Sequence, residues 1–201
     1  MIPIFIACQK FDPSCGNSWS SYIEWSGFRH IQEIVSSDII LCPSLIDTLI
    51  DEDWDFHVHT DNSLYFFYDY EYLKRRIGYD SSRHNILSLT ERPTHIPTPI
   101  DGFTFCGYDI LDSDNSISVL LNCGAFPSIY TAHDLNQLGL VDDLDRATKI
   151  AETIRDNHPD DHHCRDCHVF GIARYAVATQ QRPCTLTAKI LSLDAESICG
   201  G

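Results

Sequence analysis

The residues best suited to chemistry gather in one short segment, residues 160–168. Cysteine thiolate and histidine imidazole are ligand types that zinc prefers. The segment offers five of them, namely His162, His163, Cys164, Cys167 and His168. The favoured interpretation is nevertheless a polar turn that enters a strand, with no cofactor. Zinc is the alternative, since most structural zinc sites combine two separated ligand pairs and Cys184 is a poor second pair. The Cys-x-x-Cys-His spacing also matches c-type haem attachment, which requires export.

A second candidate is Cys123, which follows a predicted strand and precedes a glycine. A thiol displayed on such a turn can act as a nucleophile when a neighbouring base activates it. His133 and His168 are the candidate bases. The competing interpretation is a core thiol, because free cysteines are among the most buried residues in proteins. Together with the zinc candidate, this thiol defines one hypothesis, a small zinc-dependent or cysteine-dependent hydrolase.

A third pattern is Asp55-Phe-His57-Val-His59-Thr-Asp61. On a strand, a His-x-His pair places both imidazoles on one face, as in many metal-dependent hydrolases. These seven residues resemble the first motif of the polymerase and histidinol phosphatase superfamily. That resemblance implies a barrel with further His and Asp ligands, and the downstream sequence shows no matching series. Ordinary surface histidines beside an acidic loop are the competing interpretation.

Other familiar catalytic motifs are missing from the sequence. It contains no Gly-rich phosphate loop, no Gly-x-Ser-x-Gly elbow and no His-Glu-x-x-His motif. The paired carboxylates at residues 142–143 and 160–161 have local explanations, since the first pair precedes a predicted helix and the second follows a helix-ending proline. These absences favour a non-enzymatic protein over an enzyme.

Charge and aromatic content favour a binding role. Fourteen Lys and Arg against 29 Asp and Glu leave a formal charge of −15. Such a field repels nucleic acid and anionic membranes and attracts basic proteins. Aromatic side chains anchor many interfaces, and the first half of the chain is rich in them: Trp19, Tyr22, Trp25, Trp54, Tyr65, Phe66, Phe67, Tyr68, Tyr70 and Tyr72. We therefore expect an acidic interaction protein, such as an inhibitor or immunity-type factor for a basic partner.

The expected compartment is the cytoplasm. The apolar start lacks a basic region and is interrupted by Pro3, so it predicts a strand and not a signal peptide. No apolar run approaches the roughly 18 residues that a membrane-spanning helix needs. The nine cysteines, an odd number, then face a reducing environment as thiols or metal ligands.

These residues must be positioned by a mixed set of elements. Alternating patterns predict strands near residues 85–90, 103–111, 116–123 and 167–177, with the second and third paired as a hairpin around a turn at 112–115. Helical spacing predicts helices near 43–50, 69–77 and 143–157 and a short one after Thr131. The long helix carries a single apolar stripe, which indicates docking on a sheet.

The grouping of strands with strands predicts an α+β fold. We expect one domain over residues 1–201, with a mainly antiparallel sheet and helices packed on one face. The aromatic-rich first half is expected to be irregular, and residues 180–201 to form a peripheral tail.

Overall fold

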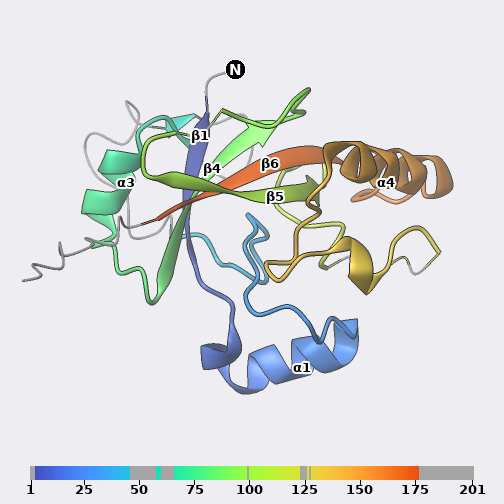
Figure 1. The fold of residues 1–201 in the computed structure, drawn as a ribbon, viewed down its shortest axis with the longest axis horizontal. Helices are drawn as coiled ribbons and strands as arrows, with labels where there is room; N and C mark the ends of the chain where they lie inside the picture. Colours follow the sequence, from blue (N-terminus) through green and yellow to red (C-terminus); the bar gives the residue numbers. More distant parts are fainter. Residues whose placement is uncertain are drawn as a thin grey trace, which may run out of the picture.

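The computed structural model describes residues 3–45, 58–59, 66–98, 100–122, 126 and 128–176. Within these ranges, six strands form one sheet in the order β2-β3-β1-β4-β6-β5, and every neighbouring pair is antiparallel (Figure 1). The strands are β1 (Ile4–Gln9), β2 (Val58–His59), β3 (Phe66–Phe67), β4 (His84–Glu91), β5 (Phe103–Leu111) and β6 (His168–Tyr175). The α+β class with an antiparallel sheet is thus confirmed.

Three of the four predicted strands form where the alternation placed them, as β4, β5 and β6, and the apolar start forms β1. Along β1, side chains alternate between two hydrophobic clusters. Ile6 and Cys8 belong to one cluster, whereas Phe5 and Ala7 belong to the other. Both faces of β1 are therefore buried, which explains why its sequence is almost continuously apolar.

The predicted strand at 116–123 is absent from its described part, residues 116–122, and β5 pairs with β6 instead. A single bridge joins Leu111 to Ser118. The Asp112 side chain accepts hydrogen bonds from the Ser116 and Ile117 backbone amides. These amides are therefore not available for hydrogen bonds to a neighbouring strand. Residues 118–121 are all buried, so the apparent alternation reflects a buried turn and not one face of a strand. The turn at 112–115 forms as predicted, and Cys123 lies outside the described residues.

Two of the three described helices begin after an aspartate whose side chain caps them. The helices are α1 (Asn17–Ser26), α3 (Tyr70–Arg76) and α4 (Leu144–Asn157), with 3-10 turns η1 (Pro13–Cys15) and η3 (Ala132–Asp134). The Asp69 side chain caps α3 and the Asp143 side chain caps α4. Thr131 and Asp134 form the predicted capping box. The predicted helix at 43–50 lies mostly outside the described residues, as does the tail at 180–201.

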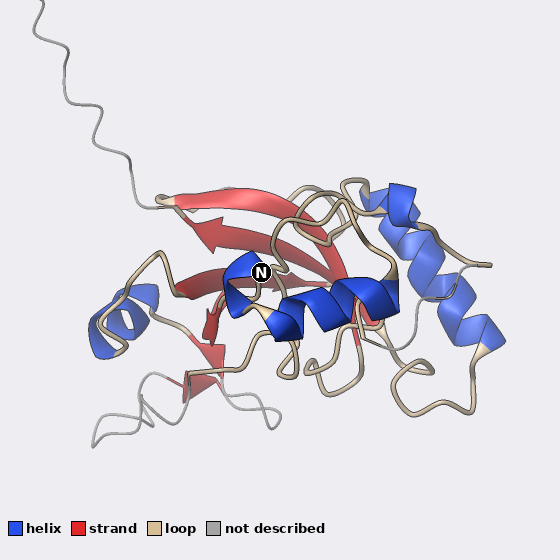
Figure 2. Cartoon of the chain, turned by 90° about the horizontal axis from the view of Figure 1, so that it is seen from below, coloured by secondary structure: helices blue, strands red, loops and turns tan. Residues whose placement is uncertain are grey.

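The helices do not share one face of the sheet. Tyr72 and Leu73 of α3 pack in the cluster that contains Phe5 and Ala7. Trp19 and Tyr22 of α1 belong to the other cluster, with the apolar stripe of α4. Seen from below, α1 crosses in front of the sheet while α3 and α4 lie at opposite ends (Figure 2). The expectation of helices on one face therefore needs correction, because both faces are apolar and both require cover.

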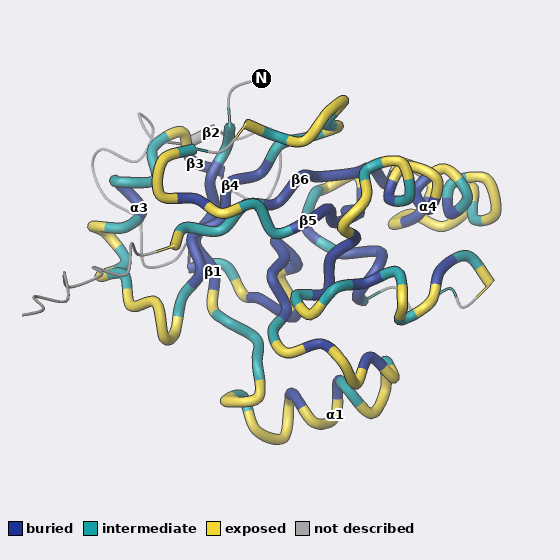
Figure 3. Tube along the Cα trace, in the orientation of Figure 1, coloured by how far each residue is buried: buried dark blue, intermediate teal, exposed yellow. Residues whose placement is uncertain are grey.

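An irregular segment, residues 28–45, lies between α1 and the sheet in Figure 1. It has no helix or strand, only bridged residues at Ile34 and Ser44. Much of it is nevertheless fully buried, together with the inner strands (Figure 3). The expected irregular first half is thus part of the core.

Candidate functional site

A cleft of about 380 Å³ lies where the second half of α4 approaches the start of β6 and the turn at residues 91–93. Its basic side chains are Arg92, Arg155 and His168. Its remaining lining is Pro93, Thr148, Ala151, Asp166, Cys167 and Val169. Two of the residues singled out in the sequence, Cys167 and His168, therefore lie in one cleft with two arginines that the sequence did not single out.

Arg92 reaches this cleft from an unusual backbone conformation. Its φ is +45°, a left-handed conformation that residues other than glycine rarely adopt. Its amide donates to the Val169 carbonyl at 2.9 Å, which holds the turn after β4 against β6. Strained backbone conformations persist where surrounding structure enforces them, and they are common at functional sites.

Arg155 and Thr148 come from α4, whose position the core determines. Ala147, Ile150, Ala151 and Ile154 form its predicted stripe and are buried. Arg155 follows this stripe, and its Nη1 donates to the Cys167 carbonyl at 2.8 Å. That bond anchors one side of the guanidinium group.

His168 is more deeply buried than the two arginines of the cleft. Its Nδ1 lies 3.3 Å from the Asp166 carbonyl, and its Nε2 lies 3.2 Å from the Glu91 carboxylate, an ion-pair distance without hydrogen-bond geometry. Burial lowers the pKa of His168, and Arg92 and Arg155 lower it further, against the opposite effects of the Asp166 carbonyl and Glu91.

The remaining predicted zinc ligands do not converge with His168. Cys164 and Cys167 are fully buried, and burial raises the pKa of the Cys167 thiol to about 11. His163 Nδ1 lies 2.9 Å from a carboxylate oxygen of Asp112, while the ring of His162 packs edge-on against that of His163. Among the described residues, no three His, Cys, Asp or Glu side chains are grouped to hold a metal ion. Zinc binding by this segment stays a prediction.

The other chemical candidates are scattered. His133 is exposed on η3, apart from the cleft lining. His57 and Asp61 fall outside the described residues, and for His59 the backbone alone is placed, in β2. Cys123 itself lies outside the described residues, so the thiol hypothesis stays a prediction.

Three aspartates that no sequence pattern singled out are fully buried. Asp109 accepts from the Ser36 hydroxyl at 2.5 Å, the Ser118 hydroxyl at 2.7 Å and the Ile110 amide at 2.8 Å. Burial raises its pKa to about 7, although these donors lower it. Asp38 and Asp112 are equally buried. A charged residue inside the apolar run of β5 was the signal for Asp109, since buried carboxylates require dedicated donors.

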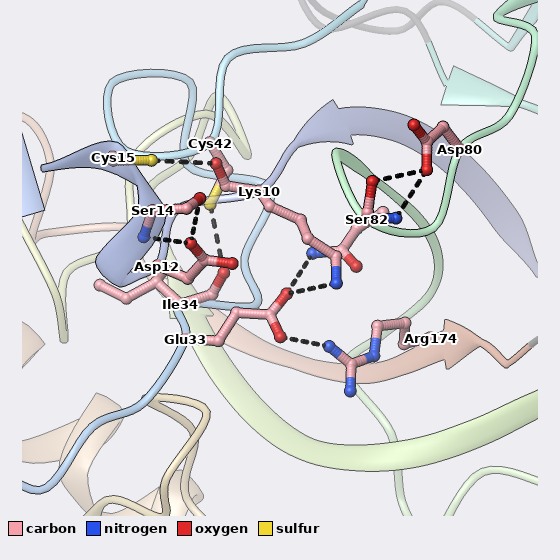
Figure 4. Close-up of polar contacts among 11 residues, drawn as sticks. Lys10, Asp12, Ser14, Cys15, Glu33, Ile34, Cys42, Asp80, Ser82 and Arg174 are labelled. Carbon is pink, nitrogen blue, oxygen red and sulfur yellow. Dashed lines mark hydrogen bonds and ion pairs between the residues drawn. The ribbon is translucent and has the colours of Figure 1, made fainter.

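A partly buried ion-pair network joins the irregular segment to the sheet (Figure 4). Glu33 accepts from Arg174 of β6 at 2.7 Å and from the Asn85 side chain of β4 at 2.9 Å, and Lys10 lies 3.7 Å away. The arrangement holds residues 28–45 against the sheet. The Glu33 carboxylate is fully occupied by these three partners, which marks the network as a structural contact.

A second cavity, of about 330 Å³, lies over β4 and β6 beneath the loop at residues 93–100. Its polar lining consists mainly of hydroxyl groups, from Ser88, Thr90, Thr94 and Thr98. Pro97 closes over Gly171, where a side-chain Cβ would stand 2.7 Å from the proline ring. This cavity lacks the charged groups that distinguish the cleft beside α4.

Among the described residues, no helix is both long enough and apolar enough to cross a membrane. Comparison with known proteins found no matching family model, no matching curated protein and no matching solved structure.

Proposed function

We propose that this chain is an acidic binding protein for a basic protein partner, in the manner of an inhibitor or immunity-type factor. The observation that supports it best is the exposed side of α4. Asp145, Glu152 and Asp156 are exposed there, and Lys149 is the only fully exposed cation of the helix. The loops at both ends add more exposed carboxylates, at residues 142–143 and 160–161.

The two arginines of α4 are only partly exposed and are held by other groups. Arg146 is held by Asp134, with Nε to oxygen at 2.7 Å, and Arg155 donates to the Cys167 carbonyl. The carboxylates of α4 thus stand beside one exposed lysine. Such a surface accelerates encounter with a basic protein and disfavours nucleic acid.

The acidic surface is also rigidly held. The opposite side of α4 is buried in the main hydrophobic cluster, so the carboxylates keep fixed relative positions. A preorganised surface loses less conformational entropy on binding.

Aromatic residues support the proposal less than the charge does. Trp19, Tyr22, Phe66, Phe67 and Tyr72 are buried, so they serve the core. Trp25 and Tyr68 are 57% and 48% exposed and could anchor a partner. Trp54 and Tyr65 lie outside the described residues.

The proposal includes a reducing compartment such as the cytoplasm. Cys8 and Cys42 are free thiols whose sulfurs donate to the Ser36 and Ile34 carbonyls. Buried free thiols are typical of proteins from reducing compartments.

The test is affinity capture followed by charge reversal. We expect the wild-type chain to retain one stoichiometric basic protein, with binding that weakens as salt increases. The double variant Glu152→Lys with Asp156→Lys should lose this partner. The matched control is Glu24→Lys with Asp101→Lys, which makes the same change in net charge at exposed residues of other elements.

Three results would count against the proposal. The first is a chain that retains no partner, the second is a partner that is acidic, and the third is equal loss of binding in both double variants. The third result would mean that net charge alone, and not the surface of α4, governs the association.

A further inference from the structure

We propose that the cleft formed by Arg92, Arg155 and His168 binds a small organic acid through a single carboxylate. This site is separate from the acidic surface of α4 and does not depend on the proposed protein partner. It is also opposite in charge to the molecule as a whole, which carries −15.

The net charge of the side chains around the cleft suits a ligand that carries one negative charge. Arg92 and Arg155 contribute two positive charges, and Glu91, 3.7 Å from Arg92 and 3.2 Å from His168, contributes one negative charge. Asp166 is paired with Arg165 at 3.1 Å, so these two cancel. Apart from His168, the cleft keeps an excess of one positive charge, which a monocarboxylate would neutralise.

The donors suit a carboxylate in geometry as well as in charge. A guanidinium group presents parallel N–H donors that match the two oxygens of a carboxylate. Arg155 is anchored through Nη1 on the Cys167 carbonyl, and the Arg92 backbone is anchored on the Val169 carbonyl. The Arg155 guanidinium group and the Arg92 backbone are therefore attached to the first residues of β6 before a ligand arrives.

The walls of the cleft suit an apolar ligand body. Pro93, Ala151 and Val169 line it, and its volume of about 380 Å³ is at the small end of the usual range for ligand sites. A phosphate dianion is the less favourable ligand, because it would leave one negative charge unmatched beside Glu91 in a strongly acidic protein.

The experiment uses benzoate as the probe and the full chain at neutral pH. Titration followed by calorimetry or by NMR of the 91–93 and 166–169 amides should show saturable one-to-one binding of benzoate. Benzamide, which has the same ring without the charge, should bind at least about tenfold more weakly, because a charge-assisted contact with arginine is lost.

Two variants locate the site. We expect Arg92→Gln and Arg155→Lys each to weaken benzoate binding by about tenfold or more. In Arg155→Lys the positive charge remains, but the two parallel N–H donors of the guanidinium group are lost. Arg83→Gln is the matched control, since Arg83 is exposed and is absent from the lining of the cleft; its affinity should stay within about twofold of wild type. Arg92 is exposed, so its variant remains informative if Arg155→Lys fails to fold.

Absence of saturable benzoate binding would overturn the proposal. So would equal binding of benzamide, or a loss in Arg83→Gln as large as in Arg92→Gln. Inorganic phosphate provides the last comparison: tighter binding of phosphate than of benzoate at the same amides would overturn the carboxylate assignment in favour of a phosphate site.

Discussion

The long helix α4 and the irregular segment 28–45 are both built into the same core, but they are stabilised in different ways. In α4 the backbone polar groups are satisfied within the helix, and one stripe of side chains is buried. In residues 28–45 the amides find distant partners, such as the Ile34 amide on the Phe11 carbonyl and the Val35 amide on the Leu138 carbonyl. A helix can therefore be read from local spacing, whereas the loop depends on a few contacts with remote parts of the chain.

The core stripe of α4 should give the largest response to a single substitution. Ile150 is fully buried, so Ile150→Ala should lower the free energy of unfolding by about 2 to 5 kcal/mol through lost burial and a residual cavity. Lys149→Ala, one residue away and exposed, should change it by no more than about 0.5 kcal/mol. Urea unfolding measures both values, and equal effects would show that the helix register is incorrect.

The irregular segment should respond to loss of a carboxylate. The oxygens of Asp38 accept from the Ile40, Leu41 and Ser118 amides at 2.9, 2.8 and 2.8 Å. Asp38→Ala leaves these amides without their acceptor, which should destabilise the fold by roughly 2 to 3 kcal/mol. The effect is limited because burial raises the pKa of Asp38, so the charged form is itself costly to bury.

Asp101→Ala, at an exposed carboxylate, is the control for that measurement and should be nearly neutral. If Asp38→Ala were as mild as this control, the carboxylate would not organise the loop. The contrast between local and remote stabilisation would then be lost.

A change of one pH unit should alter the free energy of unfolding less than either core substitution does. Asp109 has a pKa of about 7 in the folded protein, above its ordinary value of 3.8, because it is buried. Between these values the folded state holds a proton that the unfolded state releases, so this contribution is complete below the lower value and is lost as pH rises toward 7. Wild type should therefore lose up to about 1.4 kcal/mol of stability per pH unit in this window through Asp109.

Asp109→Asn removes this titration. Urea unfolding from about pH 4.5 to pH 7.5 should show that the variant gains stability relative to wild type as pH rises. Parallel curves for the two proteins would show that Asp109 has an ordinary pKa in the folded state. The difference between the curves isolates Asp109 from other carboxylates, such as Asp134, whose pKa is lowered by the bond from Arg146.

Much of the fold followed from local patterns. The alternation in residues 85–90, 103–111 and 167–177 identified β4, β5 and β6, and the spacing in residues 143–157 identified α4 with its Asp143 cap. These signals are reliable because strand and helix periodicities act over neighbouring residues and repeat several times within one element. Composition also established the charge of −15, on which the proposed binding role rests.

Only the tertiary structure decided which polar residues meet. The predicted hairpin between β5 and residues 116–123 was replaced by pairing of β5 with β6, because Asp112 and Asp38 take the amides of that segment. Arg92, Arg155 and His168 are separated by up to 76 positions in the sequence, and no spacing rule relates them. They share a cleft because β4 and β6 are adjacent in the sheet and α4 packs beside them.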